Sequence, residues 1–401
     1  MNLGACGKYP GMEDDMERRK GINNDDLKKR NRGLILQLIA AGEANTRMSL
    51  TRKSGLTKMS VTNIIDEFLE KNLVHEGEKE YQEVQGRNPA TLEISPKAPK
   101  IIGLLINREY LAAVLCDFQL HVQKKKRISF SKDAKEMFLP HIFELVDEML
   151  AGEENVLGIG VASIGPLDVE KGVILNPPRF HGIKNVQIKD ILQEKYGFPV
   201  FLDHPYNSAA RAEKLFGYGR NVSSFAFVGI TNGIGAGIYV DGKILQSPGG
   251  LGSELGHMSI DYHGIQCECG NRGCVENYAS VNVICDKAEA ALGRKVDFAE
   301  CCALYREPAI DRILSDAVEK LCVCLVSVVN LINPEVIFMG HESVELPDCY
   351  MERMEQIINE RKLSTEYSKV RVMKASFGKE QQLVGAVCNV LNPLFSGKML
   401  L

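Results

Sequence analysis

The spacing of apolar residues predicts three helices in the first seventy residues of the chain. Apolar residues recur at helical spacing within residues 25–42, where Gly42 ends the pattern. Shorter patterns of the same kind predict helices over residues 46–53 and 58–69. A tight turn around Gly55 separates these two helices. A helix, a short turn containing glycine and a second helix form a helix-turn-helix.

Two short strands are predicted after the third helix. Residues 73–74 and 90–94 read as strands that flank a charged loop containing Gly86 and Arg87. We therefore expect a winged helix-turn-helix domain over residues 21–96, preceded by an unstructured lead-in over residues 1–20. A three-helix module that binds another protein is the alternative interpretation of the same pattern.

The predicted third helix begins with side chains suited to contact DNA. Small polar groups there can reach base edges, the basic residues around them suit phosphates, and an arginine in the wing can enter a minor groove. The predicted DNA contacts are Arg47, Arg52, Lys53, Lys58, Met59, Ser60, Thr62, Asn63 and Arg87.

The remainder of the chain alternates between predicted strands and helices after a short proline-containing linker at residues 96–99. Strands are predicted over residues 101–106, 111–116, 156–163, 200–202, 225–229, 234–240 and 336–339, and helices over 137–150, 186–195 and 208–216. This alternation defines an α/β fold.

Composition and charge narrow the class of protein. A chain of 401 residues with 45% hydrophobic residues has material for two to three domains. Its net charge is −4, yet residues 18–63 hold eleven Lys and Arg against three acidic residues, the footprint of a DNA-binding module joined to an acidic body. The chain has no signal-peptide pattern and no apolar run near the roughly 18 residues of a membrane span. We expect a cytoplasmic protein without a membrane partner.

Four metal-binding side chains lie close together in the sequence GGLGSELGHMSIDYHGIQCECGNRGCVENYAS, which covers residues 249–280. Cys267, Cys269 and Cys274 form a C-x-C-x4-C array, and His257 precedes it by ten residues. Three thiolates and one imidazole make a closed tetrahedral set of the structural Zn²⁺ type. A cysteine-rich loop without metal is the alternative.

Two glutamates flank this metal loop. Glu254 lies in a G-x-E-x-G-H pattern and Glu276 closes C-x-C-G-x-x-G-C-x-E. Together the two patterns resemble the signature of the ROK family, which comprises repressors, open reading frames and sugar kinases. Residues 23–95 also resemble the N-terminal domain of ROK repressors, which the ROK sugar kinases lack.

The resemblance implies an N-terminal winged helix-turn-helix followed by a two-lobed, actin-like ATPase domain over residues 97–401. Lobe 1 would cover about 97–204 plus the C-terminal helix, and lobe 2 about 205–380, with a sugar cleft between them. The residues that the resemblance implies as sugar contacts are Glu254, His257, Glu276, Asn176 and His204.

The features that a ROK kinase needs for catalysis are missing from the sequence. The D-x-G-G-T motif that ends the first strand in the kinases is replaced by Leu105 to Glu109. The glycines from Gly229 to Gly237 persist, and we interpret them as serving a tight hairpin more than a phosphate. Pro205 stands at the position of the catalytic aspartate, and proline has no group that accepts a proton.

The sequence therefore predicts a DNA-binding regulator, most simply a repressor, that is not an enzyme. We expect a homodimer or tetramer that binds double-stranded operator DNA and answers to a sugar effector, with Zn²⁺ as structural cofactor. An ATP-dependent sugar kinase with a residual active site is one alternative. The other is a regulator whose signal is a protein partner.

Overall fold

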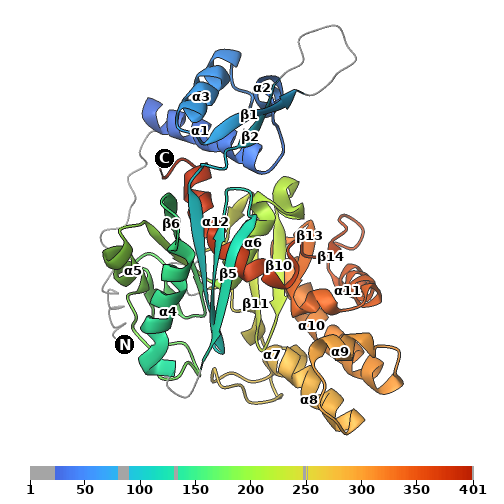
Figure 1. Ribbon diagram of the computed structural model, residues 1–401. Helices are drawn as coiled ribbons and strands as arrows, with labels where there is room; N and C mark the ends of the chain where they lie inside the picture. Colours follow the sequence, from blue (N-terminus) through green and yellow to red (C-terminus); the bar gives the residue numbers. More distant parts are fainter. Residues whose placement is uncertain (1–22, 80–89, 131–133, 247–249, 251, 400–401) are drawn as a thin grey trace, which may run out of the picture.

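Figure 1 shows an N-terminal helical domain standing on a larger body of two α/β lobes. This computed structural model describes residues 23–79, 90–130, 134–246, 250 and 252–399. The predicted lead-in at residues 1–20 and the wing residues Gly86 and Arg87 lie outside the described residues. None of the described helices combines the length and apolar character needed to cross a membrane.

The N-terminal domain consists of three helices and a two-stranded antiparallel sheet. The elements are α1 (Asn24–Ala40), α2 (Arg47–Ser54), α3 (Lys58–Glu70), β1 (Val74–Lys79) and β2 (Ala90–Ile94). Thr46 and Ser49 form a capping box at the start of α2, and Gly55 ends it with a left-handed φ of 71°. Thr57 then caps α3 by accepting a hydrogen bond from Ser60 N–H. Residues 55–57 therefore determine where α2 ends and α3 begins.

Lobe 1 contains a five-stranded sheet in the order β5-β4-β3-β6-β9. The central strand β3 is buried along its whole length, as its apolar sequence predicts. The strands are β3 (Lys100–Ile106), β4 (Tyr110–Cys116), β5 (Val122–Ser129), β6 (Val156–Ser163) and β9 (Val200–Asp203). The edge strand β5 was not predicted from the sequence, because its run of basic residues is polar on both faces.

Lobe 2 repeats the topology of lobe 1 with the strand order β12-β11-β10-β13-β14. In each lobe an antiparallel hairpin continues into two parallel strands. The strands are β10 (Phe225–Ile230), β11 (Ile234–Val240), β12 (Lys243–Ile244), β13 (Val336–His341) and β14 (Arg371–Lys374). The carboxyl ends of the central strands of both lobes face a common cleft.

Within the body, two helices lie between the sheets, and further helices pack on the outer side of each lobe (Figure 1). Helix α12 (Gln381–Phe395) packs on lobe 1, and α6 (Pro205–Leu215) packs on lobe 2. Helices α4 (Ala134–Leu150) and α5 (Ile188–Tyr196) cover the outer face of lobe 1. On lobe 2 this layer consists of α7 (Glu276–Ala279), α8 (Val281–Leu292), α9 (Phe298–Ala303), α10 (Pro308–Ile332) and α11 (Asp348–Arg361).

The N-terminal domain shares a hydrophobic core with the body. Leu36 and Ile39 of α1 belong to the same buried cluster as Leu394 and Phe395 of α12. The segment expected to be a linker is anchored as well, because Ala98 is 2% exposed. The domain is therefore seated on α12.

Candidate ligand cleft and metal site

A cavity of about 460 Å³ lies between the lobes and is open to solvent. Lobe 1 lines it with the turn after β3, which carries Asn107 and Arg108, and with the junction between β9 and α6. Lobe 2 contributes the turn at residues 231–234 and the segment at residues 252–257. The predicted sugar contacts His204, Glu254, His257 and Glu276 all line this cavity, although they come from three separate segments of the sequence. Asn176 does not: it is exposed and absent from the cavity lining.

The junction between β9 and α6 brings His204 and Pro205 to the cavity. β9 ends at Asp203, His204 is the N-cap residue of α6, and Pro205 is its first residue. Proline suits this position, because the first helical residue needs no N–H donor and has the φ that proline imposes. The imidazole Nε2 of His204 lies 2.6 Å from the carbonyl oxygen of Gly250. Nε2 of His204 is thus hydrogen-bonded to the backbone, and Nδ1 remains available to a ligand.

The two glutamates approach the cavity from either side of the metal loop. Glu276 accepts a 3.4 Å hydrogen bond from Ile234 N–H, whereas Glu254 is exposed. Gly256 allows this packing: a Cβ there would lie 2.3 Å from Ile234 O and 3.2 Å from Glu276 Oε2. The glycine in the G-x-E-x-G-H pattern is therefore required for close approach of the loop to β11.

The four predicted metal ligands converge on one point. The ligand atoms of His257, Cys267, Cys269 and Cys274 all lie within 4.8 Å of one another. Cys269 Sγ is 3.6 Å from Cys274 Sγ, and Cys267 Sγ is 3.7 Å from His257 Nδ1. A tetrahedral zinc ion with Zn–S bonds near 2.3 Å places its sulfur ligands roughly 3.8 Å apart. The donor set and its spacing therefore fit a metal ion.

The surroundings of this cluster shift the pKa values of two of its thiols in opposite directions. One thiol ionises more readily, as metal binding requires, and the other ionises less readily when no metal is bound. A backbone N–H from Asn271 lowers the pKa of Cys269, because it donates a hydrogen bond to the thiolate. Burial raises the pKa of Cys274. His257 Nδ1 is also 3.9 Å from Glu276 Oε1, so the metal cluster and the cavity share a wall.

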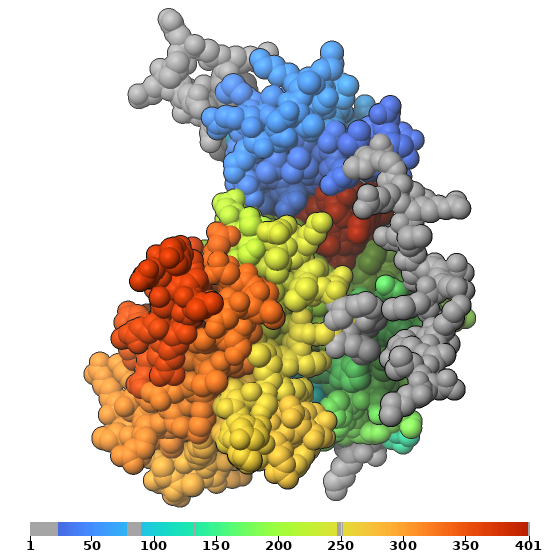
Figure 2. All heavy atoms as spheres, turned by 180° about the vertical axis from the view of Figure 1, so that it is seen from behind, coloured from blue at the N-terminus to red at the C-terminus, as the bar shows by residue number. Residues whose placement is uncertain are grey.

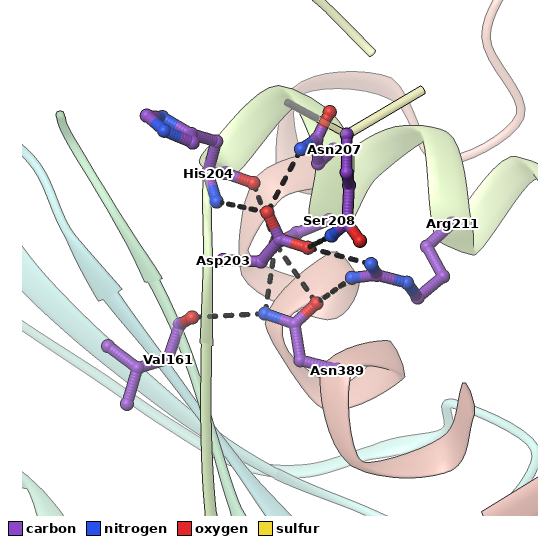
Figure 3. Close-up of polar contacts among 8 residues, drawn as sticks. Val161, Asp203, His204, Asn207, Ser208, Arg211 and Asn389 are labelled. Carbon is purple, nitrogen blue, oxygen red and sulfur yellow. Dashed lines mark hydrogen bonds and ion pairs between the residues drawn. The ribbon is translucent and has the colours of Figure 1, made fainter. Parts of the chain in front are cut away.

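A buried polar network lies directly behind this cavity (Figure 3). Asp203 pairs with Arg211 at 2.7 Å and accepts hydrogen bonds from Asn207 and from His204 N–H. Burial raises the pKa of Asp203, but the Arg211 charge and these hydrogen bonds outweigh burial and hold the pKa below its usual value. No local sequence pattern predicts this network, because Asn389 joins it from the far end of the chain.

Aromatic side chains account for two of the glycines in the β10–β11 hairpin. A Cβ at Gly235 would lie 2.0 Å from the Tyr206 ring, and one at Gly229 would lie 2.3 Å from the His341 ring. His341 is fully buried against Tyr206 and Phe227, and burial lowers its pKa to about 3. These two glycines make room for packed rings, which agrees with their structural interpretation.

Side-chain contacts also connect the lobes across the cleft. Asn232 in the β10–β11 turn donates a 2.6 Å hydrogen bond to Glu109 in the β3–β4 turn. Arg179 of lobe 1 forms a 2.6 Å ion pair with Glu268 in the metal loop. The turns that follow the central strands β3 and β10 are thus joined directly by their side chains.

The predicted DNA contacts divide into two groups. Lys58, Met59, Asn63 and Arg52 are exposed, and Met59 retains 70% of its accessible surface. Thr62 is half-buried on the same helix. The remaining described contacts bind other parts of the protein: Arg47 pairs with Asp66 at 2.8 Å, Lys53 pairs with Glu43 at 3.0 Å, and Ser60 lies 2.9 Å from the Thr57 hydroxyl.

The fold and cavity define a two-lobed α/β protein of the sugar-kinase type, and comparison with known proteins places it more narrowly. The sequence profile described as "ROK family" matches residues 101–392, and the chain belongs to this family.

Two proteins that match nearly the whole chain are named as regulators. The xylose repressor of Caldicellulosiruptor bescii is 26% identical over 93% of this chain and 98% of its own. A crystal structure of a ROK family transcriptional regulator, described as a homologue of the E. coli MLC protein, has a TM-score of 0.77 at 27% identity and covers 93% of this chain and 98% of its own. The ROK hexokinase from Thermus thermophilus has a TM-score of 0.62 at 28% identity, and covers 72% of this chain and 97% of its own.

Proposed function

We propose that the chain is a DNA-binding transcriptional repressor of carbohydrate-metabolism genes, controlled by a sugar bound in the cavity between its lobes. The repressor relatives align over both the N-terminal domain and the body. The hexokinase aligns with a smaller share of the chain, close to the extent of the ROK profile. This chain therefore has an N-terminal domain beyond the part that the hexokinase matches, and we assign DNA binding to that domain.

The observation that carries the proposal is Pro205 in the wall of the cavity. Phosphoryl transfer to a sugar hydroxyl requires a carboxylate that takes its proton, and proline has none. The neighbouring carboxylate of Asp203 is 3% exposed and paired with Arg211, so it does not replace the missing base. The cavity accordingly binds its sugar without phosphorylating it.

The sugar would be held by carboxylates and imidazoles. Glu254 and Glu276 supply charged acceptors for hydroxyl groups, which form stronger hydrogen bonds than neutral acceptors. His257 and the free Nδ1 of His204 complete the set. We propose that a structural zinc ion on His257, Cys267, Cys269 and Cys274 fixes the position of both glutamates, as ligands of a metal orient the groups around it.

The N-terminal domain would act as a winged helix-turn-helix, with α3 in the major groove. Met59, Thr62 and Asn63 present the base-reading surface, and Arg52 and Lys58 contact phosphate. One such domain covers a single half-site, so a homodimer or a tetramer on a palindromic operator supplies the affinity. Sugar binding would release the operator by favouring a different arrangement of the lobes.

A thermal-melt screen of the zinc-loaded protein tests this proposal. The panel holds monosaccharides including D-xylose, amino sugars and sugar phosphates, and ATP is tested separately. A ligand at a hundred times its Kd adds about 2.7 kcal/mol to the stability of the folded state. We expect a sugar to raise the melting temperature of the wild type but not of Glu254→Gln, which loses the charged acceptor. Turnover of ATP in a coupled assay with a hexose, abolished in Glu254→Ala, would overturn the proposal.

A further inference from the structure

Helices α6 and α12 both begin at the cavity. Pro205 and Tyr206 in the first turn of α6 line it, and so does Gln382 in the first turn of α12. The two helices then run side by side between the lobes (Figure 1). A ligand in the cavity therefore meets the first turn of each helix.

The same two helices lead to the N-terminal domain. The last turn of α12 lies against α1 so closely that a Cβ on Gly33 would be 2.2 Å from the carbonyl oxygen of Phe395. Helix α6 continues through Gly217 into the short helix η1 (Tyr218–Asn221), whose Arg220 donates a 2.8 Å hydrogen bond to Ala41 O. Figure 2 shows the dark red end of the chain and the yellow-green segment after α6 directly beneath the blue domain.

Arg220 lies at the C-terminus of α1, where a positive charge is favoured. Ala41 is the C-cap residue of α1, and helix C-termini present carbonyl groups that attract positive charge. The same guanidinium donates from Nε to Gly217 O at 3.2 Å, which fixes the side chain between η1 and α1. Arg220 is thus a positioning residue for α1.

Buried polar groups join the two helices midway. Asn389 of α12 donates a 2.9 Å hydrogen bond to the Ser208 hydroxyl and accepts one from Arg211, both on α6. It also donates to Val161 O of β6 at 3.0 Å. Gly385 permits the contact, because a Cβ there would lie 2.6 Å from the backbone of Ser208. Such closely packed elements move together instead of deforming independently.

Helix α1 in turn holds the DNA-facing helix. Arg32 of α1 pairs with Glu67 of α3 at 2.7 Å, and Leu36 shares a buried cluster with Ile65. A shift of α1 relative to the body therefore changes the position of α3.

We propose that α6 and α12 form a two-helix strut that transmits the state of the cavity to α1, with Arg220 and the Gly33–Phe395 contact as its two points of contact with α1. This inference rests on the proposed function, since it specifies how a sugar would alter operator binding. The strut supplies the structural element whose position both ligands would bias, as coupling between two sites requires.

The first experiment needs no ligand. In Gly33→Ala the new methyl group pushes α1 away from Phe395, and we expect hydrogen exchange to rise at least threefold in the first turns of α6 and α12, at the cavity. The control is Gly42→Ala: Gly42 lies in the same domain at a φ of 66°, with nothing within 4 Å of an added Cβ. Any rise in hydrogen exchange in Gly42→Ala should stay within the N-terminal domain. Changes confined to α1 and the last turn of α12 in Gly33→Ala would overturn the strut.

The second experiment measures coupling in the full chain. Duplex DNA selected from a random library by the wild type is titrated with and without D-xylose. We expect Arg220→Ala to keep its melting-temperature shift with D-xylose, while the effect of D-xylose on DNA affinity falls at least fivefold. Arg312→Ala, at an exposed position near the start of α10, should behave as the wild type.

Undiminished coupling in Arg220→Ala would contradict the role of that residue. A wild type that binds the selected DNA and ignores D-xylose would count against the effector in the proposed function. The hydrogen-exchange experiment would then still test whether α6 and α12 transmit a change at α1 to the cavity. Failure of the strut and failure of the proposed effector are therefore distinguishable.

Discussion

Asp203 Oδ2 lies 2.7 Å from Arg211 Nη2, and the two side chains are 4% and 6% exposed. The pair connects the end of β9 with α6, and Asn389 bonds to the arginine from α12. The carboxylate of Asp203, two residues before Pro205, therefore has a structural role as the partner of Arg211. The catalytic aspartate of a kinase would instead face the ligand.

Removal of one member of this pair should strongly destabilise the body. Arg211→Met leaves the Asp203 carboxylate buried without its counter-charge, and breaking a buried pair in this way costs about 3–5 kcal/mol. Urea unfolding of the metal-loaded chain measures the effect. Asp203→Leu combined with Arg211→Met should recover much of the loss, because replacing both charges by apolar groups is often neutral. The exposed pair Arg294–Glu300 is the control: Arg294→Ala should change stability far less than Arg211→Met does, because solvent screens an exposed ion pair. An equal loss at both sites would contradict this account.

The sequence predicted the elements of the fold where one local pattern determined them. Strand β6 matches its predicted bounds of 156–163, and helices α1 to α3 lie within one or two residues of theirs. Strand β5 was missed because its basic residues follow no apolar alternation; pairing with β4 makes it a strand. The seating of α1 on α12 was also missed, since that contact joins segments more than 350 residues apart.

The site was predictable to the extent that its residues are close in sequence. The four metal ligands lie within eighteen residues, so their spacing alone predicted that they converge. Asn176 was carried over by resemblance, and the structure does not bring it to the cavity. The Glu109–Asn232 bridge depends on how the two lobes meet, and no local pattern contains that information.

Loss of one metal ligand should abolish stoichiometric zinc. Cys269→Ser replaces a thiolate by a hydroxyl that binds Zn²⁺ weakly, and leaves a site of three ligands open to water. Metal content measured by plasma mass spectrometry on the purified full chain should fall from one zinc per chain to near zero. Cys349→Ser, an exposed cysteine outside the cluster, should keep its zinc. Full metal content in Cys269→Ser would refute the assignment of the site.

Substitutions on α3 should separate base contacts from phosphate contacts. Asn63→Ala should weaken binding to the selected DNA by about 1–3 kcal/mol and relax specificity at one position. Lys58→Ala should weaken binding to all sequences similarly and reduce the slope of affinity against salt by about one. Fluorescence anisotropy at several salt concentrations distinguishes them. If Asn63→Ala lowered affinity for random DNA to the same extent, Asn63 would be a phosphate contact instead.

His341 should make the protein less stable in mild acid. Burial lowers its pKa to about 3 in the folded protein, whereas an unfolded histidine has a pKa near 6.5. Between these values the unfolded chain binds a proton that the folded chain does not, so stability falls as the pH drops below about 6.5. From pH 7 to pH 5 this one residue should remove about 2 kcal/mol.

The variant His341→Leu isolates this contribution, because leucine has no proton to exchange. Its absolute stability can differ from the wild type, since residue 341 has a φ of 58° and packs against Phe227, so the readout is the dependence on pH. Urea unfolding at pH 7, 6 and 5 should give a slope shallower by about 1 kcal/mol per pH unit in the variant. Other acid-sensitive groups, including the metal ligands, are common to both proteins and cancel in the difference. Parallel slopes for wild type and His341→Leu would show that the imidazole is not buried uncharged between Tyr206 and Phe227.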